Sequence, residues 1–208
     1  MGYLVRKADA FLREWKQNPD RNPLIIKGAR QVGKTETIRT FARENYKNVV
    51  EINFITEPAY KSIIDEGFST DHIIKLISRI DPTKHFVENE TLIFFDEIQD
   101  FPEIATALKF FKENAKYDVI CSGLLLGVQY QRIASISVGY KTDYQMYSMD
   151  FEEFLWAKGY SEEMVLDMLG HMLEGIAFSA AEHTILSNLF LEYCILGGMP
   201  AIVSSYIE

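Results

Sequence analysis

The stretch Gly28-Ala29-Arg30-Gln31-Val32-Gly33-Lys34-Thr35 fits the pattern G-x-x-x-x-G-K-[ST] at every fixed position. A short apolar run, residues 23–27, precedes it, and residues 36–46 follow it with apolar side chains at helical spacing. Strand, loop and helix in this order are the context that a phosphate-binding loop requires. A chance match is expected in about one chain of this length in a hundred, and the flanking strand and helix lower that figure further.

The pattern assigns chemistry to each residue of the loop. Its glycines allow backbone N–H groups and the positive end of the following helix to converge on an anion. Lys34 is expected to reach the β- and γ-phosphates of a nucleotide, and Thr35 to offer its hydroxyl to Mg²⁺. The predicted nucleotide-binding residues are Gly28, Ala29, Arg30, Gln31, Val32, Gly33, Lys34, Thr35 and Glu36.

A second motif places two acids after a run of apolar residues, in residues 91–99. The run predicts a strand buried on both faces, and the acids follow at its carboxyl end, where open parallel sheets hold their ligands. We expect Asp96 to hold Mg²⁺ and Glu97 to polarise the attacking water. The alternative interpretation is that both acids merely cap the helix that follows.

A further predicted strand, residues 117–123, ends in Ser122 and Gly123. A hydroxyl at that position can sense the γ-phosphate or position water, which makes Ser122 a candidate catalytic residue beside Lys34 and Glu97. The same pair also fits a tight turn with a helix N-cap. The residues alone leave both interpretations open.

The order of predicted elements indicates an α/β fold with a mainly parallel sheet flanked by helices, followed by a small all-α region. Helical patterns cover residues 3–17, 57–66, 70–81 and 101–116, and strand patterns cover residues 48–54 and, less regularly, 140–149. The aromatic residues of the first helix, Phe11 and Trp15, either wall a nucleotide base or belong to the core. We predict a core domain over residues 1–149.

Helical patterns continue at residues 151–159, 162–173, 182–196 and 201–208, so residues 150–208 are predicted to form a helical region. The segment 151–159 has the acidic first turn and the Lys-Gly end of a surface helix. Because the final helical pattern breaks off at the last residue, we expect a further C-terminal domain in the full-length protein.

Composition narrows the class of protein. The chain is 48% hydrophobic and 25% charged, which is ordinary for a soluble globular protein. It has no run of 18 apolar residues and no signal-peptide core, so we expect a cytoplasmic protein without a membrane segment. Its two cysteines, Cys121 and Cys194, are expected to be buried, reduced thiols.

The net charge of −9 is unevenly distributed along the chain. Residues 1–47 carry eleven Lys or Arg against five Asp or Glu, a balance of +6, and the remainder has a balance of −15. The positive part surrounds the loop, as suits a polyanionic nucleotide. The acidic remainder argues against broad nucleic-acid binding by this part of the protein. A protein partner or self-association stays open.

Five motifs occur in order along nearly the whole chain: G-A-R-Q-V-G-K-T at 28–35, L-I-F-F-D-E-I-Q at 92–99, C-S-G at 121–123, F-E-E-F-L at 151–155 and G-G-M-P at 197–200. Together they resemble the bacterial and archaeal AAA-like ATPase family whose members usually carry a C-terminal domain of unknown function. The resemblance implies an additional-strand P-loop ATPase core with Walker A and Walker B motifs. It also implies the phosphate and Mg²⁺ roles of Lys34 and Thr35, the metal and water roles of Asp96 and Glu97, and a sensor role for Ser122.

One departure from the family pattern bears on the rate. Many relatives have a Gly-Arg pair shortly before the F-E-E-F-L helix, whereas this chain has Gly139-Tyr140-Lys141. The positive charge of the missing arginine could then be supplied by Lys141, by Arg132 or by a neighbouring subunit. An arginine finger contributes ~10³–10⁵ in rate, so we expect slow ATP hydrolysis without a partner or the full-length chain.

These observations favour a Mg²⁺-dependent ATPase that acts as a nucleotide-driven switch or motor. The alternative is an interaction module that binds ATP and hydrolyses it very slowly or not at all. Adenine is preferred because the N-K-x-D motif that reads guanine is missing from the sequence. A small-molecule phosphotransferase is disfavoured by the adjacent acids, although the loop alone does not choose the phosphate acceptor.

Overall fold

A computed structural model describes residues 2–124 and 139–208, which fall into two compact units. The sheet unit comprises residues 12–30 and 34–146, and the helical unit comprises residues up to 11, residues 31–33 and residues 147–208. Residues 31–33 of the phosphate-binding loop thus group with the helical unit. The expectations for Leu125 to Val138, which include Arg132, lie outside the described residues.

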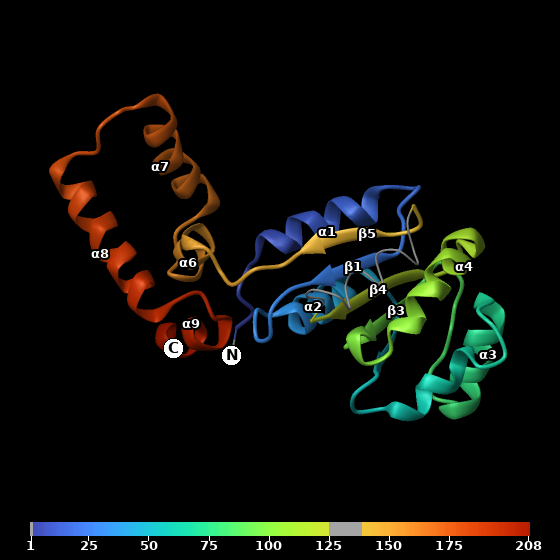
Figure 1. Cartoon of the computed structure of the whole chain (residues 1–208). Coiled ribbons are helices and arrows are strands. Elements are labelled where there is room, and N and C mark those ends of the chain that lie inside the picture. Colours follow the sequence, from blue (N-terminus) through green and yellow to red (C-terminus); the bar gives the residue numbers. More distant parts are fainter. Residues whose placement is uncertain (1, 125–138) are drawn as a thin grey trace. The chain divides into compact units, whose positions relative to one another are not determined.

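The sheet unit is built on parallel strands in the order β2-β3-β4-β1-β5 (Figure 1). The strands are β1 (Leu24–Lys27), β2 (Asn48–Asn53), β3 (Thr91–Asp96), β4 (Asp118–Gly123) and β5 (Thr142–Gln145). Strand β4 lies between β1, which leads into the loop, and β3, which ends in the acids. This arrangement confirms the predicted α/β class and the additional strand.

The register of the sheet brings the polar strand ends together. Asn53 of β2 pairs with Asp96 of β3, and Lys27 of β1 pairs with Gly123 of β4. All these strands run in one direction, so the residues that follow them collect at one edge of the sheet. That edge carries the loop, the two acids and Ser122.

Helices cover both faces of the sheet. One face packs against α3 (Thr70–Ile80), α4 (Ala107–Asn114) and the 3₁₀ helix η1 (Pro58–Ile64). On the other side, α2 (Lys34–Asn45) packs on β4, and its Phe41 lies 6.3 Å from Trp15 of α1 (Lys7–Gln17), between ring centroids. Trp15 is buried and donates its indole N–H to the carbonyl of Asn22 at 2.8 Å. Of the two interpretations of this aromatic residue, the structure supports the core.

Several predicted helices have different bounds in the structure. The first helix begins at Lys7 rather than Tyr3, and the carboxylate of Asp9 in its first turn accepts from the backbone N–H of Arg6. The segment predicted as one helix over 101–116 divides into the 3₁₀ helix η3 (Pro102–Thr106) and α4, after η2 (Ile98–Asp100). The segment 57–66 forms only η1. Proline occupies the first position of both η1 and η3.

The helical unit contains α6 (Phe151–Ala157), α7 (Glu162–Glu174), α8 (Ala180–Leu196) and α9 (Pro200–Ile207). The prediction of helices here is confirmed, but α6 is not the surface helix that its sequence suggested. Phe154 and Leu155 are buried, in clusters that include Val203 of α9 and Leu189 of α8 respectively. Helix α6 is therefore a central element of its unit.

The G-G-M-P motif has a structural explanation. The backbone N–H of Met149 donates to the carbonyl of Gly198 at 2.7 Å, and a Cβ atom on Gly198 would lie 2.0 Å from the carbonyl oxygen of Met149. A side chain at this position would collide with backbone, which cannot move aside cheaply. Glycine is thus required where the segment before α6 meets the segment after α8.

Helix α8 has apolar residues on its exposed surface as well as on its buried one. Leu189 is buried, whereas Ile195 is 83% exposed. Leu191 and Phe190 are exposed to a smaller extent. Cys194 also lies on the exposed surface, so the expectation that both thiols are buried is wrong for Cys194 and confirmed for Cys121. Among the described helices, none combines the length and the apolar character needed to cross a membrane.

Candidate functional site

The loop folds its lysine back onto its own backbone. The Nζ atom of Lys34 donates to the carbonyl oxygens of Gly28 and Ala29, at 3.0 and 2.7 Å. Burial lowers the pKa of Lys34, while the carboxylates of Glu97 and Asp96 act in the opposite direction. The ammonium group therefore lies on the loop backbone and within the field of both acids.

Thr35 and Asp96 lie together as predicted. The Thr35 hydroxyl donates to Oδ2 of Asp96 at 3.2 Å, and the same oxygen accepts from the side-chain amide of Asn53 at 3.2 Å. Burial raises the pKa of Asp96, and the nearby Glu97 adds to this, against hydrogen bonds from Ser122 and Thr35.

A hydroxyl and a carboxylate are hard oxygen donors, the type that Mg²⁺ prefers. Thr35 and Asp96 supply one of each, 3.2 Å apart. Among the described residues, no group of three or more His, Cys, Asp or Glu side chains gathers as a metal site. The pair fits an ion that takes its remaining ligands from phosphate oxygens and water, the usual mode for Mg²⁺.

Glu97 has an unusual backbone. Its φ of 58° and ψ of 44° lie in the left-handed region, which a residue with a side chain adopts at a cost. Its carboxylate oxygen Oε2 accepts from the side-chain amide of Gln99 at 2.5 Å and makes no cap bond to η2. The alternative that Glu97 merely caps the next helix is therefore wrong, because the carboxylate is held by Gln99 instead.

Sequence reasoning missed two side chains of this site. Gln99 holds Glu97 and also accepts from the backbone N–H of Leu124 at 2.8 Å. Asn53 donates to Asp96 from the neighbouring strand. The signal for Gln99 was its place at the end of the acidic motif, and the signal for Asn53 was its place at the end of a predicted strand.

Ser122 is fully buried, and its hydroxyl donates to Oδ1 of Asp96. The structure thus gives Ser122 a definite partner, the carboxylate predicted to hold the metal. The sensor role stays a prediction, and it would act through Asp96.

The other loop residues differ in exposure. Ala29, Arg30 and Gln31 are exposed, whereas Val32 is buried. The carboxylate of Glu36 is exposed and pairs with Arg43 at 3.3 Å, so the predicted contact of Glu36 with phosphate would be made by its backbone N–H. Gln31 and Gly33 have positive φ angles of 65° and 95°, conformations that turn successive peptide groups of the loop.

Lys141 does not replace the missing arginine. It precedes Thr142, which pairs with Leu24 at the start of β1, so it lies at the edge of the sheet opposite the loop. Its side chain is buried and forms an ion pair with Asp143. The expectation that Lys141 could supply charge to the phosphates is therefore wrong.

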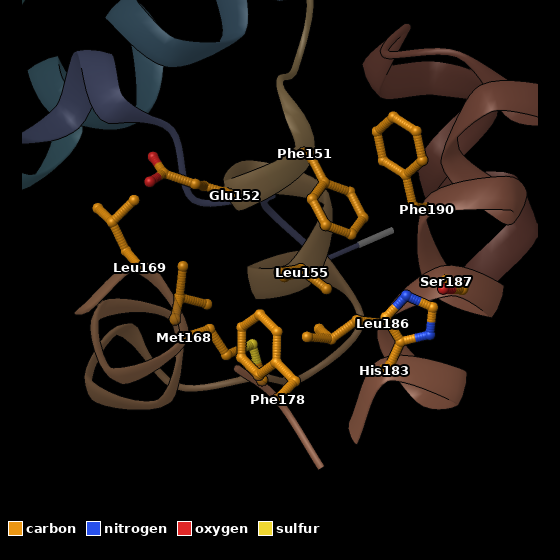
Figure 2. A pocket seen from close by; sticks show the side chains of 11 residues that line it. Phe151, Glu152, Leu155, Met168, Leu169, Phe178, His183, Leu186, Ser187 and Phe190 are labelled. Atoms are coloured by element: carbon orange, nitrogen blue, oxygen red, sulfur yellow. The ribbon is translucent and has the colours of Figure 1, made fainter. Parts of the chain in front are cut away.

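The helical unit contains a cavity of about 400 Å³ between α6, α7 and α8. Figure 2 shows its aromatic and aliphatic side chains, with the Glu152 carboxylate at the edge. The lining includes Phe151, Leu155, Met168, Phe178, Leu186 and Phe190. Such an apolar lining suits no phosphate group, so the polar edge of the sheet unit is the candidate site.

Comparison with known proteins identifies a family. A family model described as AAA domain matches residues 20–155, about two thirds of the chain. No curated protein matches the sequence significantly.

Solved structures also match. A chain in the structure of Drosophila ORC bound to DNA matches with 14% identity and a TM-score of 0.51, over 95% of this chain and 57% of that one. The structure of C. elegans PCH-2 matches with 10% identity and a TM-score of 0.44, over 84% of this chain and 50% of that one. The chain thus spans only about half the length of these two chains, and the likeness to the ORC chain concerns the fold alone.

Proposed function

The chain belongs to the AAA domain family and has the phosphate-binding loop of a nucleotide-binding protein, and we propose that it hydrolyses ATP to ADP and phosphate with Mg²⁺. The observation that carries the proposal is the hydrogen bond between Thr35 and Asp96, at 3.2 Å. It joins the residue after the loop lysine to the acid at the end of β3, with Glu97 next in the chain. This is the arrangement of donors that Mg²⁺–ATP needs.

Each residue has a role in the proposed reaction. Lys34 and the loop N–H groups bind the phosphates, and Thr35 and Asp96 hold Mg²⁺, which when bound neutralises charge on the phosphate oxygens. Glu97 accepts a proton from the attacking water, whose oxygen forms a bond to the γ-phosphorus. The bond from that phosphorus to the bridging oxygen of ADP breaks, and Gln99 orients the Glu97 carboxylate.

The proposed turnover is slow in the isolated chain. Lys141 lies at the opposite edge of the sheet, so the cation for the γ-phosphate would come from Arg132, which lies outside the described residues, or from a neighbouring subunit. Arginine fingers contribute ~10³–10⁵ in rate. A protein partner, self-association or the full-length chain would then accelerate hydrolysis, as a nucleotide-driven switch or motor requires.

The competing function is an interaction module that binds ATP without hydrolysing it. The arrangement of Glu97 favours the enzyme, because a pure binder has no need for a carboxylate oriented by a dedicated side chain. A strained backbone at the same residue supports this interpretation, since strain concentrates at functional sites.

Equilibrium titration tests the binding part of the proposal. ATP and ADP are titrated by calorimetry, with and without Mg²⁺, into the wild type, Lys34→Ala and the control Lys47→Ala. Lys47 lies on the surface and pairs with Glu90. We expect Lys34→Ala to weaken ATP binding by about tenfold or more, since it removes a charge-assisted contact, and Lys47→Ala to leave it unchanged. Equal affinity for ATP in all three proteins would mean that the loop does not bind the nucleotide.

A further inference from the structure

Arg6 is a buried cation just before α1, and it contacts the phosphate-binding loop. Only 4% of its surface is exposed. One terminal nitrogen, Nη1, donates to the backbone carbonyl of Val32 at 2.7 Å, and Nη2 donates to the carbonyl of Tyr147 at 2.8 Å. Its Nε lies 3.1 Å from Oε1 of Glu153. The guanidinium thus joins the middle of the loop to the segment that leads into α6.

Glu153 is the buried acid that holds Arg6. It is 5% exposed and is the second acid of the F-E-E-F-L motif. Its Oε1 also accepts from the backbone N–H of Lys7 at 2.7 Å, and its Oε2 accepts from the N–H of Asp150 at 3.2 Å, completing a capping box. Burying two charged groups costs desolvation free energy even when the two groups form an ion pair. A helix cap alone does not require the pairing with Arg6.

The contact with Val32 fixes the direction of a peptide group in the loop. In a trans peptide, the C=O of Val32 and the N–H of Gly33 point in opposite directions. When Arg6 holds that carbonyl, it also sets the direction of the Gly33 N–H, which belongs to the phosphate-binding pattern. A cation bound to the carbonyl also polarises the peptide and strengthens the N–H as a donor.

We propose that Arg6 is a positioning residue for the phosphate-binding loop and that Glu153 holds it in place, so that helix α6 controls the affinity of the loop for nucleotide. This rests on the proposed function in one respect, that the loop binds ATP. It assigns to the F-E-E-F-L motif a role that is more than a helix cap, because the second acid connects α6 to the loop through a single side chain.

Substitutions at three neighbouring residues separate this role from general structure. Arg6→Met removes the hydrogen bonds to Val32 and Tyr147, and Arg6→Lys keeps the charge but replaces the planar fork with a single nitrogen. Glu153→Gln keeps an oxygen for the capped N–H groups but loses the ion pair. Lys7→Met is the matched control, because Lys7 pairs with Asp150 at 2.5 Å and is part-exposed.

The measurement is the dissociation constant for ATP with Mg²⁺, at a temperature where circular dichroism shows every variant to be folded. We expect Arg6→Met to weaken binding about tenfold or more, the usual effect of losing hydrogen bonds from a charged donor. The dissociation constants of Arg6→Lys and Glu153→Gln are expected to lie between those of Arg6→Met and the wild type. The dissociation constant of Lys7→Met is expected to equal that of the wild type.

A double-mutant cycle tests whether the two residues act together. If Glu153 acts through Arg6, Arg6→Met combined with Glu153→Gln weakens binding no more than Arg6→Met alone. Val203→Ala serves as a stability control, because it removes a fully buried side chain of the helical unit. It is expected to lower the melting temperature and to leave the dissociation constant unchanged.

The outcomes are distinct. Wild-type affinity in folded Arg6→Met or Arg6→Lys would overturn the positioning role, as would additive effects in the cycle. If Val203→Ala weakened ATP binding as much as Arg6→Met, the effect would be one of stability and the proposal would also be overturned. If the folded wild type bound no ATP, the proposed function itself would be wrong.

Discussion

At the scale of single residues, Gln99 is the side chain that decides where the Glu97 carboxylate lies. Its amide donates to Glu97 at 2.5 Å, and its oxygen accepts from the N–H of Leu124. We predict that Gln99→Ala lowers the single-turnover rate of ATP hydrolysis about tenfold, because a misoriented general base loses part of its ~10²–10⁴ contribution. The dissociation constant for ATP is expected to stay unchanged, since Gln99 does not lie in the loop.

The same prediction has a second variant. A Cβ atom on Gly123 would lie 2.6 Å from the side-chain oxygen of Gln99, so Gly123→Ala should displace Gln99. It is expected to slow hydrolysis similarly and to add little when combined with Gln99→Ala. Gln17→Ala, at the exposed end of α1, is the control. Full activity in Gln99→Ala would mean that Glu97 needs no such support.

A pair of glycine substitutions tests the close approach at Met149. Gly198→Ala is predicted to lower the free energy of unfolding by ~2 kcal/mol or more, because its Cβ would overlap the Met149 carbonyl, at 2.0 Å. Gly170→Ala, within α7 and with nothing near its Cβ, is predicted to raise it by about 0.5–1 kcal/mol through helix propensity. Urea denaturation measures both, and equal effects of the two would contradict the account.

At the scale of elements, Asp118 ties the start of β4 to the segments around it. It accepts two hydrogen bonds from Arg21, at 2.7 and 2.8 Å, and one from the hydroxyl of Tyr46 at 2.6 Å. Burial would raise the pKa of Asp118, but the hydrogen bonds from Arg21 and Tyr46 outweigh it and the pKa is lowered. The cluster lies at the edge of the sheet away from the candidate site.

This lowered pKa predicts a dependence of stability on pH. A carboxyl group with a lower pKa in the folded state stabilises the fold above its unfolded pKa, about 3.9 for Asp, and loses that contribution as pH falls through the folded pKa. Asp118→Asn should cost ~1–3 kcal/mol at pH 7 and less at pH 3. Urea unfolding at both pH values measures this. A cost that does not change with pH would mean that the charge of Asp118 contributes nothing.

At the scale of the whole molecule, the sequence predicts the elements and their order along the chain, whereas the order of the strands within the sheet comes from the structure. The loop, the acidic motif and the alternation of strands and helices are contiguous signals, and each appears in the structure near its predicted bounds. The F-E-E-F-L segment is predicted as a surface helix, and its acidic first turn and Lys-Gly end are local signals of helix capping alone. Its burial comes from packing against α8 and α9, and Glu153 pairs with Arg6, far away in the chain; no local pattern indicates these contacts.

The same reasoning explains what was missed in the site. Asn53 and Asp96 meet only because β2 and β3 are neighbours in register, and Gln99 reaches Leu124 only across the end of β4. Lys141 was considered near the phosphates because of its place before α6, yet the pairing of β5 with β1 puts it at the other edge. Strand pairing, rather than residue type, decides these cases.

The most direct measurement is single-turnover hydrolysis of ATP with protein in excess and Mg²⁺ present, in the wild type and in Glu97→Gln. We predict slow but measurable phosphate release by the wild type, and a rate at least about 100-fold lower in Glu97→Gln with ATP affinity preserved. Equal rates in the two proteins, with ATP bound by both, would contradict the ATPase and leave an ATP-binding interaction module.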